Sequence, residues 1–421
     1  MTLRVLIATP GHPDHVPGGT DIAARDLVRA LRASGRAEAV LVAGVTRLHR
    51  EPPGDQLLLA AEGADDEILI FAGAYDRFLM SRQDAAALHD AWARILRRTR
   101  PDIVHLHGLD RLGADIVALI RRLRPRARIV LTLHDFAPIC FNGGLMRRPG
   151  DGGLCERASA AACARCFPEH SIERFRMREL HLRATLLAVD QLFAPSRFLA
   201  ERFVRWGIPA ERIVVVPNAA AATAATAAPS PDRQGVFGFF GNLVPHKGIL
   251  TLLEALRQAR AGGDDLRLEV HGAAPFPEPG FEAALAEARR DAQGVTWHGG
   301  FGRDELAARM AGVGWVVVPS AWWENAPLVV LEAFRHGRPV ICSGIGGMAE
   351  LVPDGIAGLH VPPGDPPALA RALRRAATEP GLWARLREGI PAVMDHAAWA
   401  ERHLGLYARL LAGPRERAIA A

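Results

Sequence analysis

Two glutamates, Glu324 and Glu332, stand eight residues apart, a spacing that suits two groups flanking one ligand. A run of valines ends just before them and a helix-period segment follows, so the stretch is predicted to form strand, loop, helix and strand. Pro327 suits the first helical position, which places Glu324 in the loop and Glu332 in the second turn of a helix that ends at His336. A helix start offers unpaired N–H groups to a phosphate, and the acids would accept hydrogen bonds from sugar hydroxyls. An ordinary crossover with two solvated acids is the alternative.

A lysine and a glycine pair stand in two further turns that follow predicted strands. Lys247 lies in the turn GNLVPHKG, residues 241–248, just ahead of a predicted helix, and from there its ammonium can reach a diphosphate. Gly18 and Gly19 follow the first strand, where glycine lets the backbone approach a ligand at the carboxyl edge of a parallel sheet. Neither turn carries the Walker order or Gly-x-Gly-x-x-Gly, so a solvated lysine and a flexible connector remain the alternatives.

Three histidines fall at or near the carboxyl ends of predicted strands: His105, His107 and His134. The alternation of its strand favours a buried, structural role for His105. His134 closes the segment TLHD directly before a loop, a position that suits a side chain facing a ligand at the sheet edge. We therefore predict a functional role for His134.

Four cysteines gather in a stretch rich in glycine and arginine: Cys140, Cys155, Cys163 and Cys166. Four thiols that end in Cys-x-x-Cys match the ligand count of a structural zinc site, and a reducing cytoplasm argues against disulfides. The first spacing is wider than in a usual zinc knuckle, so an iron–sulfur cluster and free thiols stay open beside zinc, which we favour. Such a site would fasten a long loop and take no part in chemistry.

An arginine-rich helix is predicted from Glu169 to Val189, and it carries Arg174, Arg176, Arg178 and Arg183. We favour a solvated surface helix. A peripheral contact with acidic membrane lipid, or with an anionic acceptor, is the alternative.

Short apolar strands alternate with helical patterns and position all of these residues; in the first half they are predicted at 3–10, 39–44, 67–73, 102–108 and 128–135. After Asn218 the composition collapses into a low-complexity linker, and a second series begins at Val236. This alternation predicts an α/β fold of two doubly wound, Rossmann-like domains facing across a cleft. We set a first domain at 1–217, a linker at 218–235 and a second domain at 236–395, with 396–421 packing back on the first.

The composition is that of a soluble globular protein of two or three domains, with 421 residues of which 49% are hydrophobic. No apolar run approaches the roughly 20 residues that a membrane span needs, and the N-terminus lacks a signal-peptide pattern, so we expect a cytoplasmic protein. The formal net charge of +5 is modest for this length, and we predict no nucleic-acid partner.

Gly18-Gly19, TLHD, GNLVPHKG, Glu-x7-Glu and GIGGMAELVPDGIAGLHVPPGD occur in this order, and with them the sequence resembles the family 4 glycosyltransferases, which have the GT-B fold. The resemblance covers nearly the whole chain and is strongest from Val236 to Asp365. It implies a retaining, hexosyltransferase-type enzyme that moves a sugar from a nucleotide-sugar donor to a glycan or lipid-linked acceptor, as in surface polysaccharide biosynthesis. No metal or other cofactor would be required for catalysis, and the sequence indeed contains no Asp-x-Asp.

The resemblance also implies roles for individual residues in the donor pocket. Glu324 would contact the hydroxyls of the donor sugar, Glu332 the ribose and Lys247 the diphosphate. The backbone at Ala326 and Leu328 would meet phosphate or sugar at the helix mouth. In the other domain, the resemblance places Gly19 beside the diphosphate or acceptor, and His134 near the transferred sugar.

The sequence departs from the family pattern at two places. Asn242 stands where the family usually has an arginine, which would leave Lys247 less help in stabilising the departing diphosphate. The usual glycines after the first glutamate are replaced by Asn325, Ala326 and Pro327. By their positions, Asn242 and Asn325 are still expected to belong to the donor-binding residues. Two other functions therefore stay open: a nucleotide-sugar epimerase or phosphorylase, and an inactive nucleotide-sugar binding protein on the same fold.

Overall fold

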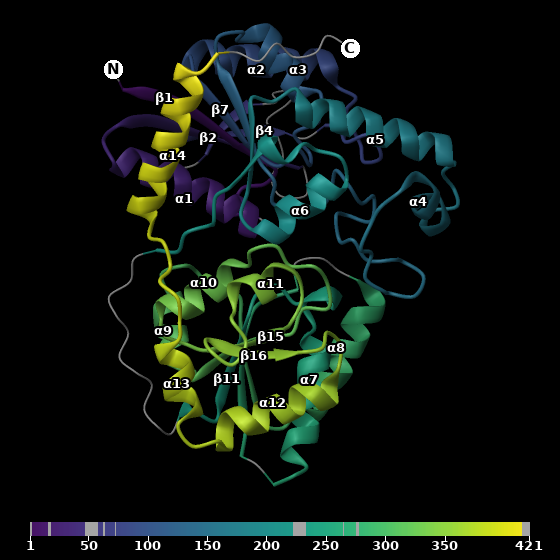
Figure 1. Ribbon diagram of the computed structural model, residues 1–421, viewed down its shortest axis with the longest axis vertical. Helices are drawn as coiled ribbons and strands as arrows, with labels where there is room; N and C mark the ends of the chain where they lie inside the picture. Colours follow the sequence, from purple (N-terminus) through teal and green to yellow (C-terminus); the bar gives the residue numbers. More distant parts are fainter. Residues whose placement is uncertain are drawn as a thin grey trace. The chain divides into compact units, whose positions relative to one another are not determined.

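The computed structural model describes residues 2–15, 18–46, 58–61, 64–71, 73–221, 233–263, 265–274 and 278–414. The chain forms two compact units, Met1–Asn218 with His396–Ala421, and Ala219–Asp395 (Figure 1). Most of the predicted linker, 222–232, and the end of the predicted C-terminal segment, 415–421, lie outside the described residues. Within the described ranges no helix is long and apolar enough to cross a membrane.

The first unit is built on an eight-stranded sheet with the order β10-β9-β8-β7-β1-β2-β4-β3. Neighbouring strands are parallel except β3 and β4, which are antiparallel. The strands are β1 (Leu3–Thr9), β2 (Ala37–Val45), β3 (Leu58–Ala61), β4 (Ala64–Phe71), β7 (Ile103–His107), β8 (Arg128–Thr132), β9 (Gln191–Ala194) and β10 (Ile213–Val215); β5 (Tyr75–Asp76) and β6 (Ser81–Arg82) form a separate hairpin. Strands β7 and β8 are buried along their whole length, as expected for a parallel sheet covered on both faces.

Helices of this unit connect the strands, and the C-terminal helix joins them from the far end of the chain (Figure 1). They are α1 (Gly19–Ala33), α2 (Ala85–Thr99), α3 (Ile116–Leu123), α4 (Ala160–Cys166), α5 (Ile172–Leu187), α6 (Arg197–Arg205) and α14 (His396–Ala412). The sequence predicts that Thr20 or Asp21 caps this first helix, but neither residue does so. Gly18 is the N-cap without a side-chain bond, because the Asp21 carboxylate instead accepts hydrogen bonds from Thr9 Oγ1 at 2.5 Å and from the Gly11 N–H at 2.8 Å.

The second unit carries a six-stranded, fully parallel sheet with the order β13-β12-β11-β14-β15-β16. This is a doubly wound order: successive strands are added on one side of the first strand up to the third, and from the fourth strand on they are added on the other side. The strands are β11 (Val236–Phe240), β12 (Arg267–His271), β13 (Val295–Gly299), β14 (Trp315–Val318), β15 (Val340–Ser343) and β16 (Gly358–Val361). The helices are α7 (Ile249–Arg260), α8 (Pro279–Asp291), α9 (Leu306–Ala311), α10 (Leu328–Arg335), α11 (Gly346–Leu351), α12 (Pro366–Thr378) and α13 (Leu382–Glu388).

Two apolar layers on the faces of this second sheet hold it rigid. Phe237 and Trp315 point to one layer and are fully buried against the leucines of α7 and α12. Val316 and Val330 belong to the other layer, beneath α10. Burial of each such side chain contributes about 1.5–3 kcal/mol, so the loops at the sheet edge rest on a well-packed base. The predicted α/β fold of two doubly wound units is confirmed.

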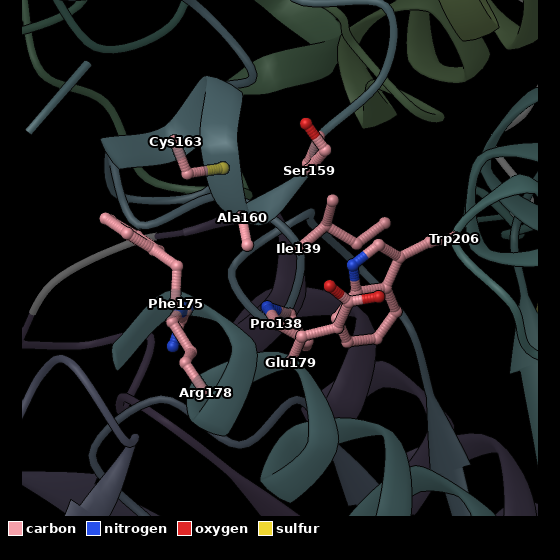
Figure 2. Close-up of a pocket in the computed structure, with 10 residues that line it drawn as sticks. Pro138, Ile139, Ser159, Ala160, Cys163, Phe175, Arg178, Glu179 and Trp206 are labelled. Atoms are coloured by element: carbon pink, nitrogen blue, oxygen red, sulfur yellow. The ribbon is translucent and has the colours of Figure 1, made fainter. Parts of the chain in front are cut away.

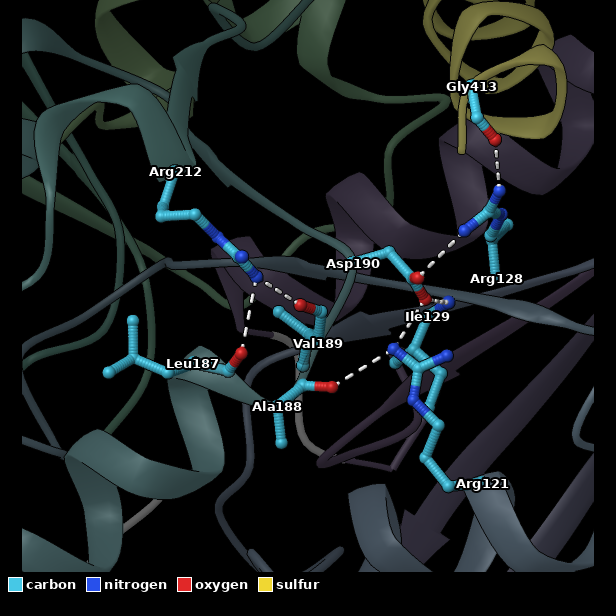
Figure 3. A network of polar contacts seen from close by, with 9 residues as sticks. All are labelled: Arg121, Arg128, Ile129, Leu187, Ala188, Val189, Asp190, Arg212 and Gly413. Carbon is cyan, nitrogen blue, oxygen red and sulfur yellow. Dashed lines mark hydrogen bonds and ion pairs between the residues drawn. The ribbon is translucent and has the colours of Figure 1, made fainter. Parts of the chain in front are cut away.

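The buried carboxylate of Asp190 links the end of the C-terminal helix to the first sheet (Figure 3). Its side chain is 7% exposed and pairs with Arg121 at 2.6 Å and Arg128 at 3.3 Å. It also accepts the N–H of Ile129 at 2.7 Å. Arg128 in turn donates to the carbonyl of Gly413 at 2.5 Å, just beyond α14. The network therefore ties three segments that are far apart in the sequence.

Replacing Asp190 with alanine is expected to lower the free energy of unfolding by about 3–5 kcal/mol, because two guanidinium groups would lose their buried counter-charge. Urea titration followed by circular dichroism measures this change. Asp151→Ala is the matched control, since the pair of Asp151 with Arg148 is exposed, with side chains 61% and 47% accessible. Its loss is expected to change the free energy of unfolding much less than the loss of Asp190, because water already screens an exposed pair. Equal effects of the two substitutions would contradict the role assigned to Asp190.

Candidate active site

The candidate site of the second unit lies at the topological switch point of its sheet. Strands β11 and β14 are neighbours there, and the loops that leave their carboxyl ends carry Lys247 and Glu324. Open α/β sheets bind ligands at such a point because the two loops diverge and leave room between them. The two residues, 77 positions apart in the sequence, meet here: Lys247 Nζ donates to Glu324 Oε1 at 2.5 Å.

Two glycines let the loops of the site approach this closely. Gly248 follows Lys247 with a φ of 76°, and a Cβ at this position would stand 2.0 Å from the carbonyl oxygen of Pro319. Gly347 donates its N–H to the carbonyl of Glu324 at 2.7 Å, and a Cβ there would stand 1.6 Å from the carbonyl oxygen of Asn325. Any side chain at either position would push the loop of Glu324 away.

One oxygen of the Glu324 carboxylate receives three hydrogen bonds. Besides Lys247, Ser320 Oγ donates to Oε1 at 2.8 Å and Trp322 Nε1 donates to it at 2.8 Å. The side chain is only 6% exposed, so its direction is fixed by these bonds. Trp322 also holds the lysine, whose Nζ lies 5.5 Å from the centre of the indole ring. The other oxygen, Oε2, has none of these contacts and is left to accept from a ligand.

Burial tends to raise the pKa of Glu324, but the charge of Lys247 and the hydrogen bonds from Lys247, Ser320 and Trp322 outweigh it and hold the pKa below its ordinary value. The carboxylate is therefore ionised at neutral pH. An ionised acid accepts hydrogen bonds from sugar hydroxyls but cannot donate a proton to a leaving group. Its chemistry is that of positioning.

The start of helix α10 differs from the prediction at one residue, Pro327. Pro327 is the N-cap, with extended backbone angles, and α10 begins at Leu328. Proline has no N–H group, but its place at the N-cap leaves the N–H groups at the start of α10 unaffected. These groups stay available to a ligand, as at any helix start. Asn325 is 5% exposed, whereas Ala326 and Leu328 are half-buried.

Glu332 lies in the second turn of α10, as predicted, and its carboxylate accepts a hydrogen bond from Arg303 at 3.1 Å. Arg303 comes from the loop after β13 and was not a candidate in the sequence.

Asn242 lies half-buried in the loop after β11, between residues that pair with the end of β12. Gly241 donates to the carbonyl of His271, and Leu243 donates to that of Ala273. The backbone of this loop is thus well fixed.

Lys247 carries a signal in the sequence that composition alone conceals. The chain has 51 basic Lys and Arg residues, and Lys247 is its only lysine. Since every other Lys or Arg position is arginine, the single lysine indicates a site that suits a compact ammonium better than a planar guanidinium fork.

The remaining two predicted residues, Gly19 and His134, belong to the first unit. Gly19 is the first residue of α1, directly after the loop that leaves β1, and a Cβ there would meet no atom within 4 Å. The Asp21 carboxylate holds this loop; burial raises its pKa against the hydrogen bonds from Thr9 and Gly11. Sequence reasoning considered Asp21 only as a helix cap and missed this role.

His134 lies two residues beyond the end of β8, and its Nε2 is 2.9 Å from Nδ1 of His107, which closes β7. Burial lowers the pKa of His134 to about 4 and that of His107 well below its ordinary value. Both rings are therefore neutral at pH 7. His105 is completely buried between Thr132 Oγ1 and the Tyr407 hydroxyl, both at 2.6 Å. It has the structural role that was expected.

The stability of the protein should report the neutral state of His134. Because its pKa is about 4 when folded and about 6.5 when unfolded, protonation favours the unfolded chain as the pH falls through this window. We expect wild type to lose about 2 kcal/mol more than His134→Gln between about pH 7.5 and pH 5. Urea titrations at both pH values measure the difference. Equal losses in the two proteins would show that His134 is not buried as a neutral ring.

Among the residues that the structure describes, no disulfide joins the four clustered cysteines, and each of them is half-buried. In the described part of the chain, no three or more His, Cys, Asp or Glu side chains are arranged so that they could hold a metal ion. The geometry thus offers no fit for zinc, which stays a prediction from the sequence. Figure 2 shows Cys163 at a cavity between α4 and α5, with Phe175 and Arg178. Its volume of about 10 Å³ would hold no more than a water molecule.

Two family profiles together cover most of the chain. A profile described as "Glycosyltransferase Family 4" matches residues 17–222, and one described as "Glycosyl transferases group 1" matches residues 234–379. These ranges contain all the residues of the candidate site.

Similar proteins of known name and structure agree with these profiles. The chain is 28% identical over 186 residues to an alpha-D-kanosaminyltransferase of Streptomyces kanamyceticus, and 30% over 185 residues to a lipopolysaccharide 1,2-N-acetylglucosaminetransferase of Salmonella typhimurium. These matches cover 42% and 41% of this chain, but only 47% and 48% of the relatives, about half their length. The structure of Anabaena HepE with UDP-glucose has a TM-score of 0.67 at 18% identity, covering 96% of this chain and 99% of that one. The predicted GT-B fold is confirmed.

Proposed function

Because the chain belongs to glycosyltransferase family 4, we propose that it is a retaining, hexosyltransferase-type enzyme that moves a sugar from a nucleotide-sugar donor to a glycan or lipid-linked acceptor. The observation that carries the proposal is the pairing of Lys247 with Glu324 at the switch point, before the start of α10. An ammonium and a helix start suit a diphosphate, and an ionised, clamped carboxylate suits sugar hydroxyls. The known UDP-glucose complex of HepE, a protein of the same fold, supports a nucleotide-sugar donor.

In the proposed reaction, the bond between the anomeric carbon and the diphosphate oxygen breaks while the acceptor hydroxyl attacks from the same face. The departing phosphate oxygen takes the acceptor proton, so atoms and charge balance without a separate base. Lys247 and the N–H groups at the start of α10 stabilise the negative charge on the diphosphate. Glu324 and Glu332 orient the sugar and the ribose. Trapping a covalent sugar adduct on an acidic side chain would overturn this route.

The contacts of the candidate site suggest how each of its residues would meet the donor. Glu324 Oε1 is occupied by protein donors, so the donor sugar would bond to Oε2. Glu332 would exchange its contact with Arg303 for the ribose, or share it. Asn242, in place of the arginine usual in the family, would leave Lys247 as the main cation facing the diphosphate. We further propose a cytoplasmic reaction that serves surface polysaccharide biosynthesis, as the lipopolysaccharide transferase from Salmonella typhimurium suggests by its name.

A panel of nucleotide sugars tested for thermal stabilisation is the first experiment. A donor present at 100 times its Kd stabilises the folded protein by about 2.7 kcal/mol, which a melting curve resolves readily. The donor found in this way is then incubated with the enzyme, with and without a glycan acceptor. Release of the nucleoside diphosphate together with an unchanged anomeric configuration in the product is the expected result.

Two outcomes would favour another function. Binding of a donor without hydrolysis or transfer to any acceptor tested would favour the nucleotide-sugar binding protein. Isomerisation of the donor sugar in the absence of acceptor would favour an epimerase. A protein that is stabilised by none of the nucleotide sugars would remove the basis of the proposal.

A further inference from the structure

Exposed apolar side chains concentrate on one helix of the first unit. Seven large hydrophobic residues are exposed among those the structure describes, and four of them belong to α5: Ile172, Met177, Leu180 and Leu187. Met177 and Leu180, at 67% and 68%, are the two most exposed of the seven. A soluble protein rarely gathers such residues on one element unless something binds there.

The spacing along α5 separates an inward face from an outward one. Phe175, Arg178, Leu182 and Leu186 are spaced by three, four and four residues and are all buried, so they form the inward face. Met177, Leu180, Ala184 and Leu187 are spaced by three, four and three residues and are all exposed, so they form an apolar outward stripe. The helix is thus apolar on two sides, although its own unit covers only one.

The inward face fixes the helix firmly. Arg178 is 3% exposed and donates to the carbonyl oxygens of Phe78 and Ala137. Figure 2 shows Phe175 and Arg178 among the residues that line the cavity beside α4. The amino-terminal end of α5 is capped by Ser171, whose hydroxyl accepts the N–H of Arg174. The outward stripe is therefore presented by a rigid helix.

Arginines flank the outward stripe on both sides. Arg176 lies four residues before Leu180 on one flank, with Arg183 seven residues further along the same line, and Arg174 lies three residues before Met177 on the other. Two acids accompany them. Glu179 is engaged by Arg183 at 3.3 Å, and Glu173 lies at the amino-terminal end of the stripe, where it complements the helix dipole. Arg183 also donates to the carbonyl oxygen of Gly207 at 3.1 Å, and the Arg174 guanidinium lies 5.0 Å from the centre of the Phe78 ring. Arg174 and Arg176 therefore flank the amino-terminal half of the stripe, around Met177 and Leu180.

We propose that the outward face of α5 docks on a bilayer that contains anionic lipids. Apolar side chains between flanking arginines are what an interfacial helix needs, because the apolar stripe enters the acyl boundary while the guanidinium groups contact phosphates. A protein partner would need an apolar surface bordered by acidic groups at matching positions. A bilayer offers acyl chains beside phosphates at every point of its surface. The proposal stands apart from sugar transfer, since docking requires no nucleotide sugar.

Flotation of the full-length protein with vesicles tests the docking. We expect the wild type to bind vesicles of phosphatidylcholine that contain phosphatidylglycerol and to bind pure phosphatidylcholine vesicles much more weakly. The double variant Met177→Ser, Leu180→Ser is expected to bind at least about tenfold more weakly, because two exposed apolar side chains are lost from the stripe. Arg174→Gln and Arg176→Gln should each weaken binding to the anionic vesicles by about fivefold.

Ile356→Ser is the matched control, since Ile356 is 57% exposed but belongs to the second unit. Its binding to vesicles should equal that of the wild type, and circular dichroism should show that all variants are folded. Failure of the wild type to bind anionic vesicles would overturn the proposal, and so would unchanged binding of the double variant. A dimer in sedimentation that dissociates when Met177 and Leu180 are replaced would also overturn it, because the stripe would then join two copies of the chain.

Discussion

Lys247→Ala is expected to lower kcat for sugar transfer by about 100-fold to 1000-fold, the usual loss when one preorganised donor to a developing negative charge is removed. Lys247 is the only lysine of the chain, and Asn242 stands where a second cation would help it. The diphosphate would therefore leave without a close positive side chain. Steady-state kinetics with the donor identified by thermal stabilisation measure the loss. A kcat within about threefold of the wild-type value corresponds to a change of only about 0.65 kcal/mol in the activation free energy. Such a result would exclude Lys247 from the proposed role.

Lys247→Arg separates the need for charge from the need for a compact ammonium. The guanidinium keeps the charge but brings a planar fork that must share the space beside Trp322. We expect it to restore only part of the lost rate. Full recovery would mean that any cation serves at this position.

The stability of Lys247→Ala should depend on pH in the sense opposite to that of the wild type. In the wild type the pKa of Glu324 is lowered, so its contribution to stability is present above the unfolded pKa and is lost as the pH falls through the folded value. Without the ammonium, burial would dominate and the pKa of Glu324 would rise. The variant would then lose stability as the pH increases through that raised value. Adding Glu324→Gln should remove this penalty without restoring transfer.

A single lysine also allows a direct measurement of the site. Reductive methylation with ¹³C-formaldehyde labels Lys247 and the α-amino group, and Lys247→Arg identifies the remaining signal. The side chain is 29% exposed, so the reagent can reach it. A nucleotide-sugar donor is expected to protect Lys247 from labelling, whereas equal labelling with and without donor would argue against contact.

The sequence was sufficient to predict the residues whose positions follow from the alternation of strands and helices. Glu324 and Glu332 fall on either side of a helix start because the valine run of β14 and the period of α10 fix that start within a residue. Lys247 follows from the same logic at β11. The register of a parallel sheet places both loops at one edge, so their meeting could be anticipated even though 77 residues separate them.

The residues that hold these groups could not be predicted in the same way. Ser320 and Trp322 bond to Glu324 only because the loop turns back over Gly347, and Arg303 meets Glu332 from another loop. Side-chain partners across loops depend on local backbone geometry that no periodicity records. Asp21 shows the same limit: its type and place predicted a cap, but a loop that folds back from β1 offered it better donors.

Glu324→Gln is expected to lower kcat/KM by about 10-fold to 100-fold, because a neutral amide replaces a charged acceptor whose hydrogen bonds contribute about 1.5–3 kcal/mol each. The substitution keeps the shape of the side chain, so the loss should appear in donor binding as well as in turnover. Kinetics over a range of donor concentrations, with donor Kd from titration, measure both. A variant with unchanged kcat/KM would sink the assignment of Glu324 to the sugar hydroxyls.

Trp322→Phe tests whether the clamp on Oε1 matters apart from the charge. It removes one of the three donors but keeps an aromatic ring beside Lys247, so the expected loss is smaller, about threefold to tenfold. In the proposed reaction Lys247 and Glu324 would act on one donor, and they touch each other in the structure. The double variant Lys247→Ala, Glu324→Gln should therefore lose less than the product of the two single effects. Independent, fully multiplicative losses would show that the pair does not work as a unit, and that the contact of 2.5 Å between them is not part of the proposed mechanism.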